Sequence, residues 1–261
     1  QIELGVIPAD TELTPRPEAI VSWDEYPDRY KPVASRLMEA FAGFLAHTDH
    51  HIHRLLTSLE ERGMLDNTLV FYITGDNGAS GEGTLHGAWS APSFQNGRPE
   101  DPEWLLEHMD DFGSADCENH YNYPWAWALD SPFQWMKQVA SHFGGTRNAM
   151  AVSWPKGITD AGGLRTQFHH VVDIAPTIYE ACGITQPSSV NGIEQMEVHG
   201  TSMAYTFDDA DVADRHETQY FEMMGNRGVY HQGWMASCFH GRPPWIRWQG
   251  MPFDGEQERW E

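Results

Sequence analysis

The chain has 261 residues, and its 16 Lys and Arg against 38 Asp and Glu give a formal net charge of −22. This balance excludes nucleic acid as a partner, because phosphate contacts need clustered basic side chains. No apolar run approaches the roughly 20 residues of a membrane span, and the cysteines at 117, 182 and 238 lack zinc-site or disulfide-framework spacing. We expect a soluble protein of one α/β domain or about one and a half. The sequence assigns neither an oligomeric state nor a compartment, cytoplasmic or periplasmic.

Residues 1–34 are expected to form an extended connector on the surface. They show little periodicity and contain five prolines, which are Pro8, Pro15, Pro17, Pro27 and Pro32. The first residue is not Met, and residues 257–261 carry no recognisable end signal. We therefore expect a trimmed or partial chain, in which a targeting signal would not be visible.

A long amphipathic helix is predicted from Ser35 onward. Apolar residues recur at three- and four-residue spacing, at Leu37, Phe41, Phe44, Thr48, Ile52, Leu55 and Leu59, and Gly63 is well placed to end the helix. His47 and His51 stand at i and i+4, a spacing that lets two imidazoles share one metal. The H-E-x-x-H pattern is absent, so a solvated or hydrogen-bonded helix face is the favoured interpretation.

Residues 68–74 read as a buried strand, rich in β-branched and aromatic types. The run is apolar almost throughout, which is typical of a parallel strand covered on both faces. Asp76 and Asn77 follow at its carboxyl end, where open α/β sheets place their ligands. The pair supplies a carboxylate and an amide oxygen suited to a hard cation, although Asp-Asn-Gly is also common in ordinary turns.

The stretch 78–123 has no sustained period, which predicts an active-site loop or lid. Several aromatic residues then surround Lys137, namely Trp125, Trp127, Phe133 and Trp135. They could wall a pocket for a flat substrate or form core. A second short buried strand is predicted at 148–155, and Asp173 is expected to cap a helix that ends before Gly183. Short antiparallel strands are predicted at 219–223, 228–231 and 234–239.

Several of these stretches, taken together, resemble the sulfatase family, in the arylsulfatase branch of the alkaline-phosphatase-like superfamily. The residues that carry the resemblance are 71–80 (FYITGDNGAS), 172–184 (VDIAPTIYEACGI), 192–203 with its HGTSM, and 220–231 (YFEMMGNRGVYH). They follow the family's order from about Gly5 to about Trp248. The resemblance implies an alkaline-phosphatase-like mixed α/β sheet flanked by helices, with a small C-terminal antiparallel sheet. It divides the chain into a connector (1–34), the carboxyl-side part of the catalytic domain (35–205) and an incomplete C-terminal subdomain (206–261).

The resemblance also implies a chemistry. Sulfatases hydrolyse sulfate esters with a formylglycine nucleophile and a calcium ion, which combine Lewis-acid assistance with charge stabilisation. Asp76 and Asn77 match the family's late pair of calcium ligands. Lys137 looks like its sulfate-binding lysine, a compact cation for a sulfate oxygen. The implied substrate is a small-molecule sulfate ester, of the aryl type.

The departures from the family pattern limit this reading. No C-x-P-x-R or S-x-P-x-R motif, the source of formylglycine, is present, and the family's early Asp pair has no counterpart. We expect these elements upstream of Gln1 and expect the fragment alone to be inactive. Two alternatives stay open: a phosphodiesterase or phosphonate monoester hydrolase of the same superfamily, and a non-catalytic module that keeps the fold without the nucleophile.

Overall fold

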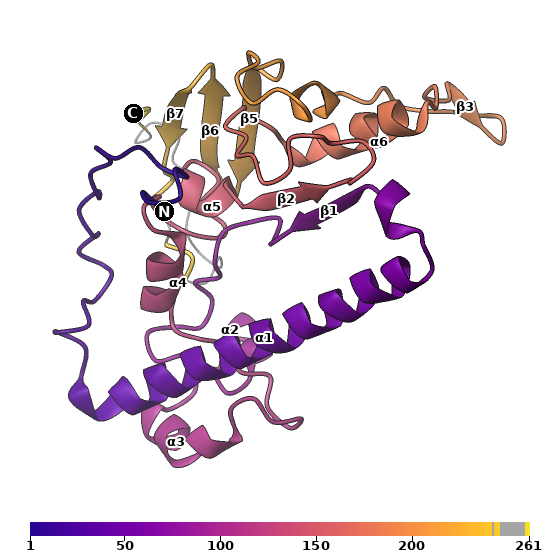
Figure 1. Cartoon of the computed structure of the whole chain (residues 1–261). Helices are drawn as coiled ribbons and strands as arrows, with labels where there is room; N and C mark the ends of the chain where they lie inside the picture. Colours follow the sequence, from indigo (N-terminus) through magenta and orange to yellow (C-terminus); the bar gives the residue numbers. More distant parts are fainter. Residues whose placement is uncertain (242, 246–258) are drawn as a thin grey trace.

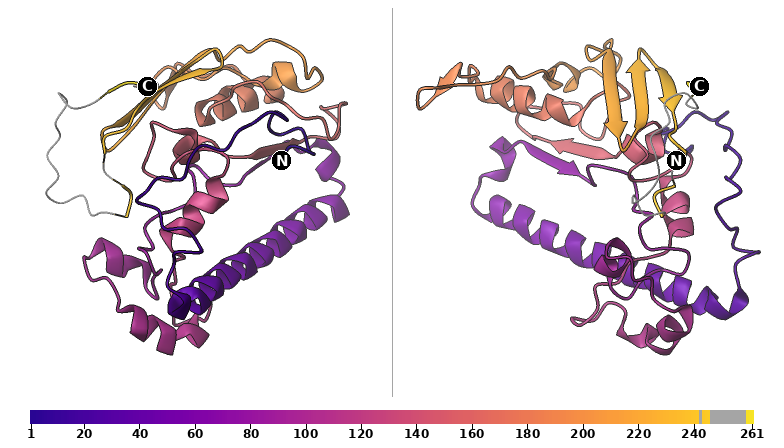
Figure 2. Two further views of the ribbon diagram at one scale, coloured as in Figure 1. Left: turned by 90° about the vertical axis from the view of Figure 1, so that its left-hand side faces the viewer. Right: turned by 180° about the vertical axis from the view of Figure 1, so that it is seen from behind.

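The computed structural model describes residues 1–241, 243–245 and 259–261. Its elements are helices packed around small antiparallel sheets (Figure 1). Helix α6 and the C-terminal sheet lie on one side of the two-stranded β1–β2 ladder, and the long helix α1 lies on the other (Figures 1 and 2). The chain is therefore a layered mixed α/β protein, as predicted. The predicted features at 242 and 246–258, including residues 257–258 of the stretch 257–261 and the match at Trp248, lie outside the described residues.

The N-terminal segment runs without helix or strand to a short 3-10 helix, η1 (Asp28–Tyr30), and then enters α1 (Lys31–Glu61). Helix α1 begins four residues before the predicted start because Pro32 is tolerated in the first turn, where backbone N–H groups have no partner. Gly63, with φ of +65°, follows its end as predicted. Only the first turns of α1 are buried, at Val33, Ala34 and Leu37.

Strand β1 (Val70–Ile73) pairs antiparallel with β2 (Met150–Ser153), with Val70 opposite Ser153 and Ile73 opposite Met150. Both strands were predicted, but β2 is not buried as expected, since Met150, Ala151 and Ser153 are exposed, and the buried parallel setting expected for β1 is wrong. Within the described residues β2 is its only strand partner, and the Tyr72 and Ile73 side chains are exposed. An apolar run does not by itself distinguish a parallel from an antiparallel neighbour.

The stretch 78–123 was expected to be irregular, yet it contains two short helices, α2 (Ala91–Gln95) and α3 (Pro102–Glu107). Asp101 caps α3 by accepting the Glu103 N–H, with Pro102 at the first helical position. Helices α4 (Tyr123–Asp130) and α5 (Phe143–Thr146) follow. The remaining 3-10 turns are η2 (Leu65–Asn67), η3 (Met109–Asp111), η4 (Val171–Asp173) and η5 (Ala204–Thr206).

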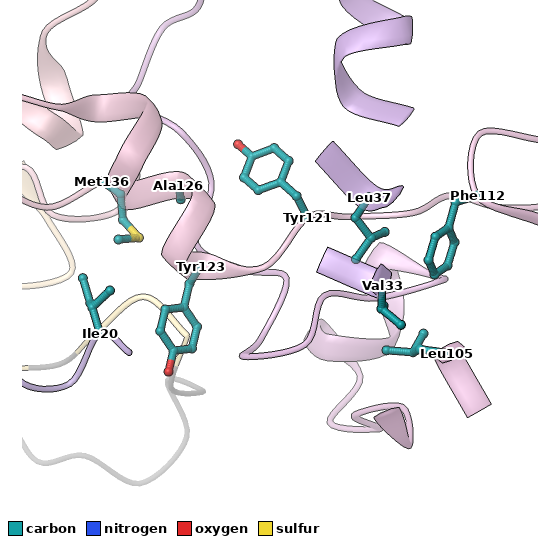
Figure 3. Close-up of a cluster of buried hydrophobic side chains, with 9 residues drawn as sticks. All are labelled: Ile20, Val33, Leu37, Leu105, Phe112, Tyr121, Tyr123, Ala126 and Met136. Carbon is teal, nitrogen blue, oxygen red and sulfur yellow. The ribbon is translucent and has the colours of Figure 1, made fainter. Parts of the chain in front are cut away.

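The principal core lies between α1, α3 and α4 (Figure 3). Its fully or nearly buried members are Ile20, Val33, Leu37, Leu105, Phe112, Tyr121, Tyr123, Ala126 and Met136. Met136 directly precedes Lys137 and has no exposed surface. A Cβ on Gly81 would lie 2.4 Å from its sulfur. The core thus anchors both the loop after β1 and the segment that carries Lys137.

Helix α6 (Ile174–Cys182) ends at Gly183, whose φ of +65° is the left-handed conformation expected there. Asp173 stands at the N-cap position of α6 as predicted, but its side chain makes no capping hydrogen bond to α6: the carboxylate instead accepts the backbone N–H groups of His170 and Thr201. A small ladder of β3 (Ser189–Val190) and β4 (Ile193–Glu194) follows α6.

The C-terminal sheet has the order β5 (Thr218–Met223), β6 (Asn226–His231) and β7 (Trp234–Cys238). All its pairings are antiparallel, as predicted. The turn between β6 and β7 holds Gln232 and Gly233 at φ of +46° and +89°, which is the tight hairpin geometry. Among the described residues, no helix is both long enough and apolar enough to span a bilayer.

Candidate active site

The loop that follows β1 carries Asp76 and Asn77. Thr74 ends the strand by donating both its N–H and its hydroxyl to the Ala149 carbonyl, at 3.2 and 3.0 Å. Next to Ala149, the Asn148 side chain forms two hydrogen bonds with the Asn77 backbone. With its amide in the orientation that satisfies both atoms, Asn148 donates from its nitrogen to the Asn77 carbonyl (3.0 Å) and accepts the Asn77 N–H at its oxygen (3.2 Å). The Asn77 backbone is therefore satisfied on both sides, which leaves side-chain oxygens to act on a ligand.

Those oxygens are accessible. The Asp76 side chain is exposed, and no hydrogen bond or ion pair to its carboxylate is present in the described part of the chain. The Asn77 amide nitrogen donates to the Gly78 carbonyl over 2.8 Å, which fixes the amide so that its oxygen is the remaining acceptor. One carboxylate and one amide oxygen next to each other suit a hard cation such as calcium.

Two glycine contacts bring this loop against the segment that holds Lys137. The Gly78 N–H donates to the Gly145 carbonyl at 3.1 Å. A Cβ on Gly78 would lie 1.6 Å from the Gly144 carbonyl oxygen, so no other residue fits without moving the backbone. Glycine at 78 is needed for this close approach rather than for an unusual φ.

Ala79 is the point at which three parts of the site meet. Its N–H donates to the Asp130 carboxylate, at 2.9 and 3.1 Å, and its carbonyl accepts the Lys137 N–H at 3.0 Å. Burial raises the pKa of Asp130 to about 7, and the Ala79 hydrogen bond only partly offsets this effect. An acid that titrates near neutral pH therefore lies beside the Asp76–Asn77 loop.

Lys137 is not on a helix; it lies in the loop between α4 and α5. Its ammonium is 3.0 Å from Glu82 Oε2, and the two side chains are 35 % and 16 % exposed. The Lys137 backbone is hydrogen-bonded to Ala79, which follows Asn77 by two residues. The structure thus places all three predicted residues, Asp76, Asn77 and Lys137, on segments that are hydrogen-bonded to each other.

Glu82 was missed by the sequence analysis. Its carboxylate also contacts the Gln138 amide (2.5 Å) and the Ser80 hydroxyl (3.2 Å). Burial would raise the pKa of Glu82, but the hydrogen bond and charge of Lys137, with Gln138 and Ser80, outweigh it and the pKa lies below its usual range. The only signal in the sequence is an acid inside the glycine-rich run Gly78-Ala-Ser-Gly-Glu-Gly83.

The fit to a metal ion is partial. Calcium takes about 6–8 oxygen ligands, and Asp76 with Asn77 supplies a minority. The described residues gather no group of three or more His, Cys, Asp or Glu side chains that could hold an ion. On α1, the Nε2 atoms of His47 and His51 are 3.1 Å apart on an exposed face, as expected for a solvated helix surface.

The predicted aromatic residues divide between two settings. Trp125 and Trp127 line a cavity of about 260 Å³ together with Trp23, Tyr26 and other residues of the N-terminal segment. Trp135 instead stacks on Phe239, with ring centroids 4.4 Å apart. The cluster therefore combines a pocket wall with packing between segments.

Comparison with known proteins identifies the family of the chain. The family described as Sulfatase matches residues 17–184, which is more than half of the chain. The chain is 27 % identical over 201 residues to an arylsulfatase of Klebsiella aerogenes, covering 77 % of this chain and 41 % of that protein. It is 29 % identical over 190 residues to an uncharacterized sulfatase of Schizosaccharomyces pombe, covering 72 % of this chain and 32 % of that protein. The chain thus spans less than half the length of these curated relatives. With the family matched across the segments that build the site, the chain belongs to the sulfatase family.

Proposed function

We propose that this chain is the carboxyl-side part of an arylsulfatase-type sulfuric ester hydrolase that acts on a small-molecule aryl sulfate. The observation that carries the proposal is the hydrogen bond from the Lys137 N–H to the Ala79 carbonyl. It ties the backbone of a residue with a cationic side chain to the loop that carries Asp76 and Asn77. Sulfate transfer needs positive charge near both the bridging and the non-bridging oxygens. The Lys137 ammonium would supply it from one side, and a cation held by Asp76 and Asn77 would supply it from the other.

Each residue has a distinct role in the proposal. The Lys137 ammonium contacts a sulfate oxygen and stabilises the charge that develops on it. The Asp76 carboxylate and the Asn77 amide oxygen hold part of a calcium site. When bound, the calcium ion would neutralise sulfate oxygens as a Lewis acid. Asn148 and Asp130 hold the loop backbone in place through the hydrogen bonds described above.

The remaining parts of the site are expected outside these 261 residues. They include the formylglycine nucleophile and the other calcium ligands. The chain covers 41 % and 32 % of its two sulfatase relatives, which supports a longer parent protein. The name of the Klebsiella aerogenes relative supports the aryl sulfate.

The test compares an aryl sulfate with an aryl phosphate as substrates of the longer protein, before and after treatment with a chelator and re-addition of calcium. We expect preferential, calcium-dependent cleavage of the sulfate. Lys137→Met should lower kcat/KM by about 100-fold, the magnitude of losing one charge-stabilising donor. Lys156→Met is the control, since Lys156 is exposed and remote from the loop in sequence.

The alternatives predict different outcomes. Faster cleavage of the phosphate would indicate a phosphodiesterase or phosphonate monoester hydrolase. No cleavage of either ester, together with an upstream sequence that lacks C/S-x-P-x-R, would indicate a non-catalytic module.

A further inference from the structure

Three side chains converge on the Glu82 carboxylate. Lys137 Nζ lies 3.0 Å from Oε2, the Ser80 hydroxyl donates to the same oxygen over 3.2 Å, and the Gln138 amide donates to Oε1 over 2.5 Å. Both carboxylate oxygens are therefore occupied, and Glu82 is 16 % exposed. Because both oxygens accept hydrogen bonds, the orientation of the Glu82 carboxylate is restricted, and its contact with Lys137 restricts that flexible side chain in turn.

The backbone around Lys137 is also held in an unusual conformation. Trp135 and Gln138 have φ of +65° and +77°, a region that non-glycine residues rarely adopt. Such conformations are energetically unfavourable and persist only where the surroundings determine them. Here the buried Met136 and the hydrogen bond from the Lys137 N–H to Ala79 provide that restraint.

Lysine is otherwise a poor candidate for a precise anion contact. Its flexible four-carbon side chain and three interchangeable N–H donors lose rotamer entropy when the ammonium is held in one place. Glu82 follows Asn77 by five residues, on the same loop as the proposed calcium ligands. A contact between Glu82 and the ammonium therefore fixes the lysine head relative to that loop.

We propose that Glu82 is a positioning residue that holds the Lys137 ammonium beside the Asp76–Asn77 loop, ordered for contact with a sulfate oxygen. This inference rests on the proposed role of Lys137 in anion binding. It has a sharp alternative, in which Glu82 is only a counter-ion that competes with the anion. The two differ in sign, because removing a competing carboxylate strengthens anion binding whereas removing a positioning carboxylate weakens it.

The experiment measures the affinity of this chain for inorganic sulfate by NMR titration at constant ionic strength, with chloride replaced by sulfate. Glu82→Ala should weaken binding about fivefold or more, although the loss of a negative charge would by itself strengthen it. Glu82→Gln, which retains an acceptor oxygen, should restore part of the loss. Glu103→Ala is the matched control, because it removes an ion pair with Arg29 elsewhere on the surface, and it should leave sulfate affinity unchanged.

A second readout separates positioning from general destabilisation. In ¹⁵N spectra of lysine ammonium groups at low temperature, a Lys137 signal assigned by its loss in Lys137→Met should be visible in the unmodified chain. It should disappear in Glu82→Ala and remain in Glu103→Ala. If Glu82→Ala does not fold, Ser80→Ala is the second variant. It removes only the hydrogen bond from the Ser80 hydroxyl to Glu82 and should weaken sulfate binding about twofold.

The outcomes distinguish this inference from the proposed function. If Lys137→Met abolishes sulfate binding but Glu82→Ala leaves it unchanged or strengthens it, the positioning role is wrong and the anion site stands. If Lys137→Met leaves sulfate binding unchanged, or the unmodified chain does not bind sulfate, the anion-binding role of Lys137 fails and the positioning role fails with it.

Discussion

His216 Nδ1 lies 2.8 Å from both carboxylate oxygens of Asp173, and this buried pair connects the start of α6 to the segment that enters β5. Asp173 has no exposed surface. Burial alone would raise the pKa of this carboxyl. Contacts from His169, from the backbone N–H groups of His170 and Thr201, and from His216 outweigh burial and lower the pKa to about 2.

The Asp173–His216 pair should make unfolding strongly dependent on pH in the acid range. A carboxyl whose pKa is lower in the folded than in the unfolded state stabilises the fold above its unfolded pKa, near 3.9. This contribution is lost as pH falls from about 4 towards 2. Asp173→Asn should lower the free energy of unfolding at pH 7 by about 3 kcal/mol, since a buried pair is broken. Urea unfolding followed by circular dichroism measures both effects.

Asp66→Asn is the control for Asp173→Asn, because Asp66 is exposed. It should leave the free energy of unfolding within about 0.5 kcal/mol of the unmodified chain. An equal loss in both variants would contradict the assignment of the effect to the buried pair.

Asp130 should have the opposite pH dependence. Its pKa is raised to about 7 in the folded state, so the folded state retains a proton that the unfolded state releases near pH 4. Stability from this group therefore declines as pH rises from about 4 to 7 and stays low above 7. Asp130→Asn keeps an oxygen for the Ala79 N–H but has no proton to lose. The free energy of unfolding of this variant, minus that of the unmodified chain, should therefore be larger at pH 8 than at pH 5 by on the order of 2 kcal/mol. If the difference between the unfolding free energies of the variant and the unmodified chain is the same at pH 5 and pH 8, this prediction is wrong.

The close approach of Gly78 to Gly144 should make this position intolerant of any side chain. Gly78→Ala would place a Cβ 1.6 Å from a carbonyl oxygen and should destabilise the chain by at least about 2 kcal/mol, with displacement of the Asp76–Asn77 loop. Gly43→Ala is the matched control: it lies within α1 with nothing within 4 Å of the added Cβ. It should stabilise the chain by about 1 kcal/mol through helix propensity. Thermal melts of the two variants should therefore shift in opposite directions.

The isolated 261 residues should bind calcium weakly and release no product from an aryl sulfate. Asp76 and Asn77 provide too few of the roughly 6–8 oxygen ligands for tight binding, so we expect a Kd on the order of millimolar or weaker. Isothermal titration calorimetry measures the binding, and Asp76→Asn should weaken it further. Turnover of an aryl sulfate by this chain alone would show that the nucleophile is within it, against our proposal.

Much of the local structure was accessible from the sequence, because it depends on short-range patterns. The stripe through Leu37 and Phe41 predicted α1, and Gly63 predicted its end. The antiparallel strands predicted at 228–231 and 234–239 are the two strands of the β6–β7 hairpin. Burial was harder to predict, since it depends on which surfaces meet: Phe44 and Leu55 continue the stripe of α1 yet are 67 % and 62 % exposed. The parallel, buried setting expected for β1 failed for the same reason.

The candidate site shows the same division. Sequence alone placed Asp76 and Asn77 at the end of a strand and, through resemblance to the family, singled out Lys137. The sequence could not show that the Lys137 N–H is hydrogen-bonded to Ala79, or that the Lys137 ammonium contacts Glu82. These contacts join residues 55 or more positions apart. Residue types and their spacing determined which groups are available for chemistry. Only the packing of Gly78 against Gly144, and of Met136 into the core, decided which of those groups lie within reach of one another.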